Sequence, residues 1–163
     1  MSLIHKKCKN IKIVLTDVDG VLTDGGMYYS KDGDVMKKFH TRDGMGVTLL
    51  RKMSIPTIII TKEKTMMVKK WSSKMKIKKL YDGIIEKESM LEIICEKFNV
   101  KSEEIAFIGD DVNDLPLLKK VGFSASPNDG MEIVKEKCDY ICKKNGGNGA
   151  FREIADLILK SQF

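Results

Sequence analysis

The chain has 163 residues, of which 42% are hydrophobic and 32% charged, and its formal net charge at pH 7 is +6. This composition is typical of a globular protein and excludes a disordered or fibrous chain. No apolar run approaches the ~20 residues that cross a bilayer, and the first residues lack the apolar stretch of a signal peptide. We therefore expect one domain over residues 1–163, located in the cytoplasm.

Short β-branched runs alternate with helix-like segments along the chain. This alternation is typical of a mainly parallel sheet with helices on both faces. The expected strands are 11–16, 56–61, 79–81, 105–109, 122–125 and 139–141. The expected helices are 43–53, 64–75, 87–98, 113–121, 129–136 and 148–160. The sequence therefore predicts an α/β fold.

One segment interrupts this alternation directly after the first strand. The β-prone runs 27–30 and 35–40 flank a turn that contains Asp32 and Gly33, and Asp-Gly between two such runs is a hairpin signal. A hairpin flap over about residues 25–40 would hang over the carboxyl end of the first strand, where open α/β sheets bind ligands. The chain leaves no room for a separate cap domain of ~50 residues.

An acidic turn ends the first strand and is the sharpest motif of the sequence. Asp17 and Asp19 follow the apolar run 11–16 and precede Gly20, two apolar residues, a threonine and a further aspartate. Two carboxylates this close repel each other unless a cation lies between them. Hard oxygen ligands of this kind suit Mg²⁺. The motif therefore predicts a magnesium site.

A second acidic turn follows the strand expected at 105–109 and contains Asp110, Asp111 and Asp114. If this strand lies beside the first, Asp110 would face Asp17 and Asp19 across one metal ion. Taken alone, an aspartate in this place is equally well explained as the N-cap of the next helix.

Two further residues extend the expected site toward a phosphate group. Thr61 ends the apolar run 56–60, so its hydroxyl and the nearby backbone N–H groups can bind phosphate oxygens, although a threonine there is also a common N-cap. Lys87 opens the helix after the run 79–81 and can reach the same pocket. Lysine is abundant in this chain, so only its place in the series of motifs singles out Lys87.

In this order, the motifs Asp-x-Asp, Thr, Lys and Gly-Asp-Asp-x-x-Asp resemble those of the haloacid-dehalogenase-like phosphohydrolases. Through the segments 39–44, 80–87 and 146–153 the resemblance extends over most of the chain to the small capless branch of that family. That branch contains the 3-deoxy-octulosonate (KDO) 8-phosphate phosphatases and the phosphatases of sialic-acid-like 9-phosphates. It implies a Rossmann-like three-layer fold and a homotetramer. Hairpins and C-terminal segments, here near 146–152, would close the active sites of neighbouring subunits.

The resemblance also implies the mechanism. Asp17 would be the nucleophile that forms an aspartyl-phosphate, and Asp19 would be the general acid and base. Mg²⁺ would be held by the carboxylates of Asp17 and Asp110 and by the backbone carbonyl of Asp19. The groups that bind phosphate, or orient the lysine and the metal-bound waters, would be Thr61, Lys87, Asp111 and Asp114.

The two kinds of phosphatase in this branch differ in their substrate-binding residues, and this chain does not match both equally well. The loop that contacts the substrate would be His40, Thr41, Arg42, Asp43 and Gly44. Members that act on KDO 8-phosphate bind the sugar with arginines at positions that here carry Thr48, Glu63 and Trp71. Glu63 and Lys74 look instead like the members that act on nonulosonate 9-phosphates, which also carry a threonine at the position of Thr41.

Two other classes of protein match parts of the pattern. A phosphoaccepting receiver domain shares the doubly wound sheet and the acidic pocket, but its acceptor aspartate follows a middle strand. A non-catalytic relative, such as the phosphatase-like tail of some sugar cytidylyltransferases, would not need the complete catalytic set found here. The positive charge is spread over scattered lysines, so we expect a small sugar phosphate as partner rather than nucleic acid or a membrane. We expect the four cysteines to be reduced thiols.

Overall fold

A computed structural model describes residues 2–163 of the protein. Its strands are β1 (Ile13–Thr16), β2 (Tyr28–Ser30), β3 (Gly33–Met36), β4 (Thr57–Ile60), β5 (Lys79–Tyr81), β6 (Ile105–Ile108), β7 (Phe123–Ser126) and β8 (Tyr140–Ile141). Its α-helices are α1 (Leu3–Lys9), α2 (Thr41–Lys52), α3 (Met66–Met75), α4 (Met90–Phe98), α5 (Leu115–Leu118), α6 (Glu132–Lys135) and α7 (Ala150–Gln162). Three short 3₁₀ turns are η1 (Lys87–Ser89), η2 (Ser102–Glu104) and η3 (Val112–Asp114). No helix within residues 2–163 is both long and apolar enough to span a membrane.

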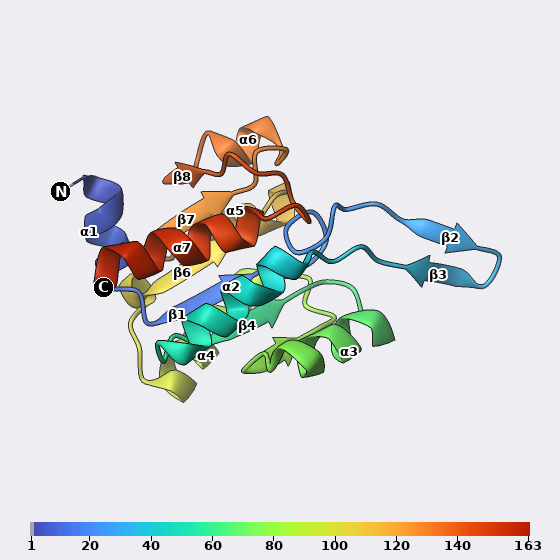
Figure 1. Cartoon of the computed structure of the whole chain (residues 1–163), viewed down its shortest axis with the longest axis horizontal. Helices are drawn as coiled ribbons and strands as arrows, with labels where there is room; N and C mark the ends of the chain where they lie inside the picture. The colour runs from blue at the N-terminus through green and yellow to red at the C-terminus, as the bar shows by residue number, and fades with distance from the viewer. Residues whose placement is uncertain (1) are drawn as a thin grey trace.

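The strands build one large parallel sheet with helices on both faces (Figure 1). Its order is β5-β4-β1-β6-β7-β8, and every neighbouring pair runs parallel. Each strand expected in this sheet occurs, with ends that differ by at most two residues from the expected ones. The predicted α/β fold is therefore confirmed.

Successive side chains of a strand point to opposite faces of the sheet, and helices cover both faces, so the side chains on each face are buried. On one face Val14 packs in a cluster with Val47 of α2 and Ile154 of α7. On the other face Leu15 packs in a second cluster with Ile94 of α4. All four residues of β1 are buried, so the central strand is a rigid base for the residues that follow it.

The hairpin predicted after the first strand is confirmed. Strands β2 and β3 pair antiparallel and project from the body of the molecule (Figure 1). Gly33 starts the return strand with φ of 109°, a backbone angle that side-chain-bearing residues rarely adopt. Met27, Tyr29 and Val35 are 68%, 66% and 59% exposed. Within residues 2–163 no separate cap domain covers the carboxyl edge of the sheet.

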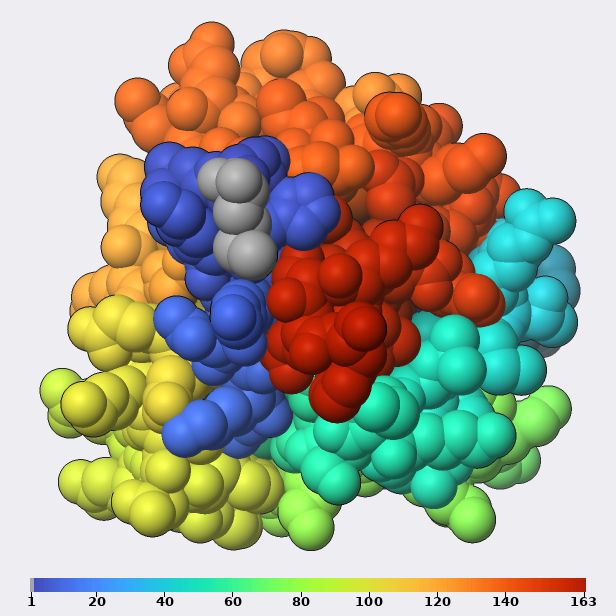
Figure 2. Space-filling model, turned by 60° about the vertical axis from the view of Figure 1, so that its left-hand side comes forward, coloured from blue at the N-terminus to red at the C-terminus, as the bar shows by residue number. Residues whose placement is uncertain are grey.

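Helix α1 was not predicted from the sequence. Its only buried residue is Cys8, so it lacks the apolar periodicity that would have indicated a helix. It lies beside the carboxyl end of α7, which brings the two ends of the chain together (Figure 2). The Gln162 Nε2 donates hydrogen bonds to the backbone oxygens of Cys8 and Ile11 at 3.0 and 2.7 Å. Long-range contact with α7 therefore stabilises this helix.

Candidate active site

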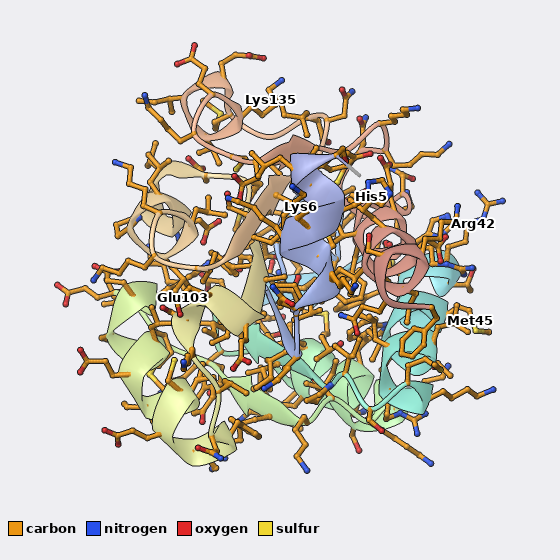
Figure 3. All side chains as sticks on the ribbon, turned by 90° about the vertical axis from the view of Figure 1, so that its left-hand side faces the viewer. His5, Lys6, Arg42, Met45, Glu103 and Lys135 are labelled. Carbon is orange, nitrogen blue, oxygen red and sulfur yellow. The ribbon has the colours of Figure 1, made fainter. Side chains whose placement is uncertain are left out.

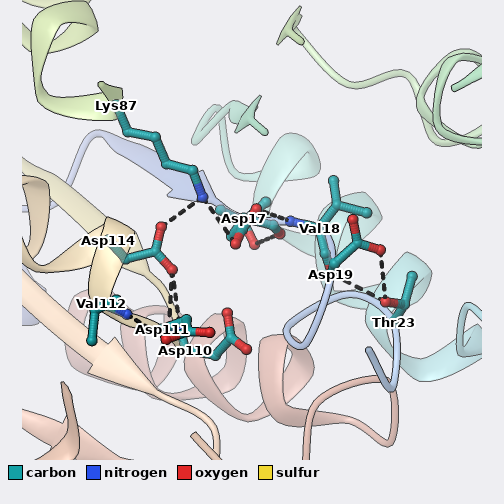
Figure 4. A network of polar contacts seen from close by, with 10 residues as sticks. Asp17, Val18, Asp19, Thr23, Lys87, Asp110, Asp111, Val112 and Asp114 are labelled. Carbon is teal, nitrogen blue, oxygen red and sulfur yellow. Dashed lines mark hydrogen bonds and ion pairs between the residues drawn. The ribbon is translucent and has the colours of Figure 1, made fainter. Parts of the chain in front are cut away.

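The two acidic turns meet at the carboxyl edge of the sheet. Strand β1 lies between β4 and β6, so the chain crosses to opposite sides of β1 and leaves a crevice at this point. The Asp17 backbone N–H donates to the Ile108 oxygen at 3.1 Å, which fixes the two turns side by side. Carboxylate oxygens of Asp17, Asp110 and Asp114 all lie within 4.8 Å of one another (Figure 4). Asp110 thus faces Asp17, as the sequence indicates.

Lys87 lies between two of these carboxylates and is completely buried. Its Nζ is 2.6 Å from Oδ1 of Asp114 and 2.9 Å from Oδ2 of Asp17. Burial lowers the pKa of this lysine, but the charges of Asp17 and Asp114 outweigh burial and raise it above its usual value. Lys87 therefore carries a positive charge at the bottom of the site.

Asp114 organises the turn that carries Asp110. Its Oδ2 accepts hydrogen bonds from the backbone N–H of Asp110 at 2.9 Å and of Asp111 at 3.4 Å, while its Oδ1 binds Lys87. Asp111 is exposed and caps η3, where its Oδ1 accepts from the Val112 N–H. Asp114 lies where it would orient Lys87, as the resemblance implies, and the contacts of Asp111 are with the backbone.

The carboxylate of Asp19 points away from this cluster. Its Oδ1 accepts hydrogen bonds from Nζ of Lys37 at 2.6 Å and from Oγ1 of Thr23 at 3.5 Å. Asp114, rather than Asp19, therefore supplies the third carboxylate of this cluster, whereas Asp19 lines the same cavity as Asp17 and Asp110. Because the backbone turns after β1, the side chains of Asp17 and Asp19 point in different directions. Ligation of Mg²⁺ by the Asp19 backbone carbonyl stays a prediction.

The acidic cluster holds its protons unusually tightly. Burial, followed by the charge of Asp114, raises the pKa of Asp17 to about 7. Burial, followed by the charges of Asp17 and Asp114, raises the pKa of Asp110 to about 8. Carboxylates that repel each other in this way fit a hard cation such as Mg²⁺. Asp17 and Asp110 would hold it, since both oxygens of Asp114 already accept hydrogen bonds.

A cavity of about 250 Å³ opens over this cluster. Thr61, which follows β4 and is 1% exposed, lies on its wall beside Glu63. The other charged residues of the wall are Asp17, Asp19, Lys62, Lys87, Asp110 and Asp111. The structure therefore places Asp17, Thr61, Lys87 and Asp110, which the sequence indicates as site residues, around one cavity.

The expected substrate-contacting loop lies outside this cavity. His40 caps α2, where its Nδ1 accepts from the Arg42 N–H at 3.1 Å. A second cavity, of about 420 Å³, is lined by His40, Thr41 and Gly44 together with Lys74 of α3. It shares no lining residue with the acidic cavity. The side chain of Arg42 points outward from α2, and it lines a third cavity beside α7 (Figure 3).

Asp43 has a structural role that sequence reasoning missed. It is fully buried, and its two oxygens accept hydrogen bonds from the backbone N–H groups of Gly149 and Arg152 at 3.3 and 3.0 Å. These N–H groups belong to the start of α7, where an anion is favoured. The expectation that this carboxylate contacts the substrate is corrected, because both of its oxygens bind α7.

The glycine-rich segment before α7 packs within its own chain. A Cβ on Gly146 would overlap the carbonyl oxygen of Gly20, and the Gly147 N–H donates to the Val21 oxygen at 2.9 Å. This segment supports the loop that carries Asp19. The contribution of the segment 146–152 to the pocket of a neighbouring subunit stays a prediction.

A parallel sheet with a crevice of carboxylates, a buried lysine and a threonine at its carboxyl edge defines the class of metal-assisted phosphate-ester hydrolases. Residues 52–154 match the profile of the family described as haloacid dehalogenase-like hydrolase. The chain belongs to this family.

Relatives of known activity share almost the full length of the chain. The 3-deoxy-D-manno-octulosonate 8-phosphate phosphatase of Haemophilus influenzae is 37% identical over 98% of this chain and 88% of its own length. The phosphatase of the same name from Escherichia coli K12 is 36% identical over 96% and 83%. Like these relatives, the chain is a phosphomonoester hydrolase.

Solved structures share the fold closely. That of the 3-deoxy-D-manno-octulosonate 8-phosphate phosphatase of Moraxella catarrhalis, in complex with magnesium, phosphate and KDO, has a TM-score of 0.95 and 37% identity. It matches 99% of this chain and 93% of that one. A cobalt-bound structure from Haemophilus influenzae has a TM-score of 0.93 and 38% identity, and matches 96% and 91%. The magnesium in the first structure agrees with the chemistry of the acidic cluster, and Mg²⁺ is the cofactor.

The raised pKa values predict how the stability of the metal-free protein depends on pH. The folded protein keeps protons on Asp17 and Asp110 up to about pH 7 and 8, whereas the unfolded chain releases them near 3.8. The protons that Asp17 and Asp110 bind in the folded protein therefore stabilise it most at about pH 4 and below. As the pH rises from about 4 to about 8, the free energy of unfolding of the metal-free protein falls by a few kcal/mol. Mg²⁺ should raise the melting temperature more at pH 8 than at pH 5.

Thermal melts in EDTA and in millimolar Mg²⁺ at both pH values would measure this effect. The control is Asp110→Asn, which removes one of the repelling charges and should flatten the dependence on pH. A metal-free protein that is equally stable at pH 5 and pH 8, with the same response in Asp110→Asn, would contradict the electrostatic description of the cluster.

Proposed function

We propose that this enzyme hydrolyses the terminal phosphomonoester of a 3-deoxy-2-ulosonic acid phosphate. The observation that carries the proposal is the acidic cavity, in which Asp17, Thr61, Lys87 and Asp110 face one space of about 250 Å³. The proposal draws further support from similarity over 99% of the chain to a phosphatase structure that contains magnesium, phosphate and KDO.

The first chemical step uses the contacts described above. An oxygen of Asp17 attacks phosphorus, and the bond to the sugar oxygen breaks. Asp19 acts as the general acid and donates a proton to that leaving oxygen. Lys87 and Thr61 stabilise the negative charge on the phosphoryl oxygens. When bound, Mg²⁺ reduces the repulsion between the carboxylate and the phosphate dianion.

The second step regenerates the nucleophile. The Asp19 carboxylate takes a proton from a water molecule, whose oxygen attacks the phosphorus of the aspartyl-phosphate. The bond between phosphorus and Asp17 breaks, and inorganic phosphate leaves. The hydrogen bond from the Val18 N–H to Oδ1 of Asp17, at 2.7 Å, helps to hold the nucleophile in one orientation through both steps.

Within this substrate class, Glu63 favours a sialic-acid-like nonulosonate 9-phosphate. Its carboxylate lines the catalytic cavity, where the resemblance places an arginine in phosphatases of KDO 8-phosphate. A carboxylate accepts hydrogen bonds from sugar hydroxyls but repels a sugar carboxylate, whereas an arginine binds a carboxylate in bidentate fashion. The relatives, in contrast, are phosphatases of KDO 8-phosphate, which remains the alternative substrate.

A phosphate-release assay separates these candidates. The panel contains KDO 8-phosphate, N-acetylneuraminate 9-phosphate, the corresponding deaminated nonulosonate 9-phosphate and simple hexose phosphates. We expect kcat/KM for a nonulosonate 9-phosphate to exceed that for KDO 8-phosphate by at least tenfold. Glu63→Arg should narrow or reverse this ratio. Equal rates on hexose phosphates would contradict the proposed substrate class.

We further propose that the protein is a homotetramer in which hairpins pack together. A two-stranded ribbon is marginally stable alone in water, yet this one exposes Met27, Tyr28, Tyr29, Val35 and Met36. The loop 40–44 lies outside the acidic cavity of its own chain. In an assembly it would be available to a neighbour's substrate. Packing of the hairpin against its own domain is the competing arrangement.

Light scattering should therefore report a mass of roughly four times 18.4 kDa. Met27→Glu places a charge in the proposed contact and should shift the protein toward smaller species with lower activity. Ile93→Glu is the matched control, because Ile93 is 50% exposed on α4. A fully active monomer at micromolar concentration would contradict the proposed tetramer.

A cytoplasmic location completes the proposal. All four cysteines, which are Cys8, Cys95, Cys138 and Cys142, are free thiols in the structure. Oxidising compartments favour disulfides, whereas reduced cysteines are usual in the cytoplasm.

A further inference from the structure

Lys37 is a buried lysine at the catalytic edge that the mechanism above does not use. Its side chain is only 4% exposed, although it directly follows strand β3 of the projecting hairpin. Its Nζ lies 2.6 Å from Oδ1 of Asp19 and 4.0 Å from Oδ2 of Asp34. A buried lysine is costly to desolvate unless it is paired, so the contact with Asp19 accounts for its position.

Two contacts fix the arm that carries Lys37. Thr23 and Phe39 form an isolated antiparallel bridge that closes the base of the hairpin. The ring of Phe39 stacks on Trp71 of α3, with centroids 4.7 Å apart and an angle of 13° between the planes. Lys37 lies between this base and β3, so the path of the hairpin determines whether its Nζ reaches Asp19.

The residues of the acidic cluster do not hold the Asp19 carboxylate in place. Its side chain is 33% exposed, and its Oδ1 has contacts with Lys37 and, more weakly, with Thr23 at 3.5 Å. Without such a contact, this half-buried carboxylate would sample several rotamers. A general acid and base must stay within hydrogen-bond reach of the leaving oxygen and of the attacking water.

We infer that Lys37 is a positioning residue that holds the Asp19 carboxylate in its working orientation and couples the hairpin to the chemistry. The inference deepens the proposed function, since it rests on Asp19 as acid and base. Lys37 does not contact the phosphate. It acts only through Asp19.

The test compares Lys37→Met, Lys37→Arg and the control Lys38→Met. Lys38 is the next residue on the same arm, is exposed, and donates to Oδ1 of Asn148 at 3.0 Å. With KDO 8-phosphate or the best substrate of the panel, kcat should fall 10- to 100-fold in Lys37→Met, with KM within threefold of the parent. Lys37→Arg should restore most of the loss, and Lys38→Met should retain parental kcat.

Rapid-quench kinetics with p-nitrophenyl phosphate supplies a signature that a general structural defect would not give. p-Nitrophenolate leaves without protonation, so the first step should proceed at close to the parental rate in Lys37→Met. The second step still needs Asp19 as base and should be slow. We therefore expect a burst of about one p-nitrophenolate per subunit, followed by slow turnover.

The double variant decides whether Lys37 acts through Asp19. In the Asp19→Asn background, Lys37→Met should lower kcat by less than threefold, because the positioned group is already lost. Full additivity, or equal rates for Lys37→Met and Lys38→Met in an active enzyme, would overturn the inference. If the parent itself releases no phosphate from any substrate, the proposed function has failed instead, so the two failures are distinguishable.

Discussion

Replacing Asp17 with asparagine should lower kcat by about 10⁴-fold or more while the fold stays intact. The substitution keeps the shape and Oδ1, which can still accept from the Val18 N–H. It removes the nucleophilic charge. The variant should also be more stable than the parent at pH 8 without metal, because one of the repelling carboxylates is gone.

Phosphate release with the best substrate and a thermal melt in EDTA would measure both effects. Asp32→Asn, at the exposed turn of the hairpin, makes the same chemical change outside the site and should leave turnover unaltered. Activity of Asp17→Asn within tenfold of the parent would rule out the covalent mechanism.

Replacing Lys87 with methionine should damage both catalysis and stability. The buried ammonium contacts Asp17 and Asp114 at 2.9 and 2.6 Å, and methionine leaves both carboxylates without that partner. Breaking a buried ion pair costs about 3–5 kcal/mol. Loss of one charge that stabilises the transition state costs about 10²–10³ in kcat. The loss of stability should be smaller at pH 5.5 than at pH 8, because Asp17 can then be protonated.

Urea unfolding at the two pH values would separate the stability effect from the catalytic one. Lys97→Met is the control, since Lys97 is exposed near the end of α4. If Lys87→Met were as stable as this control at pH 8, the ion pairs seen in the structure would have no energetic importance. Rescue of stability by Mg²⁺ without rescue of kcat would show that Lys87 has a separate role in the transition state.

The sheet was predictable from the sequence because most of its strands are short apolar runs that alternate with helix-like segments. Their order was not predicted, so the approach of Asp110 to Asp17 depended on the condition that β6 lies beside β1, which the structure meets. The helices were less predictable. Helices α5 and α6 are single turns of four residues, where longer helices were expected. The length of α5 is limited by Pro116 near its start and by Gly122 beyond its end.

The contacts of individual charged side chains were the least predictable part. Lys37 is one of many lysines, and only the course of the hairpin brings it to Asp19. Asp43 lies in a loop motif that suggested ligand binding, yet it binds the start of a helix more than a hundred residues later. Such pairings depend on tertiary packing between distant elements, which composition and local spacing do not encode.

The packing of Gly146 and Gly147 against the loop after Asp19 bears on how the enzyme becomes active during synthesis. This loop is synthesised more than a hundred residues before the glycines that support it. Local contacts can form while translation continues, whereas this one has a high sequence separation and must wait. A nascent chain that already contains β1, β4 and β6 would therefore have its central strands but a poorly ordered catalytic loop. Maturation of the active site would be among the final events of folding.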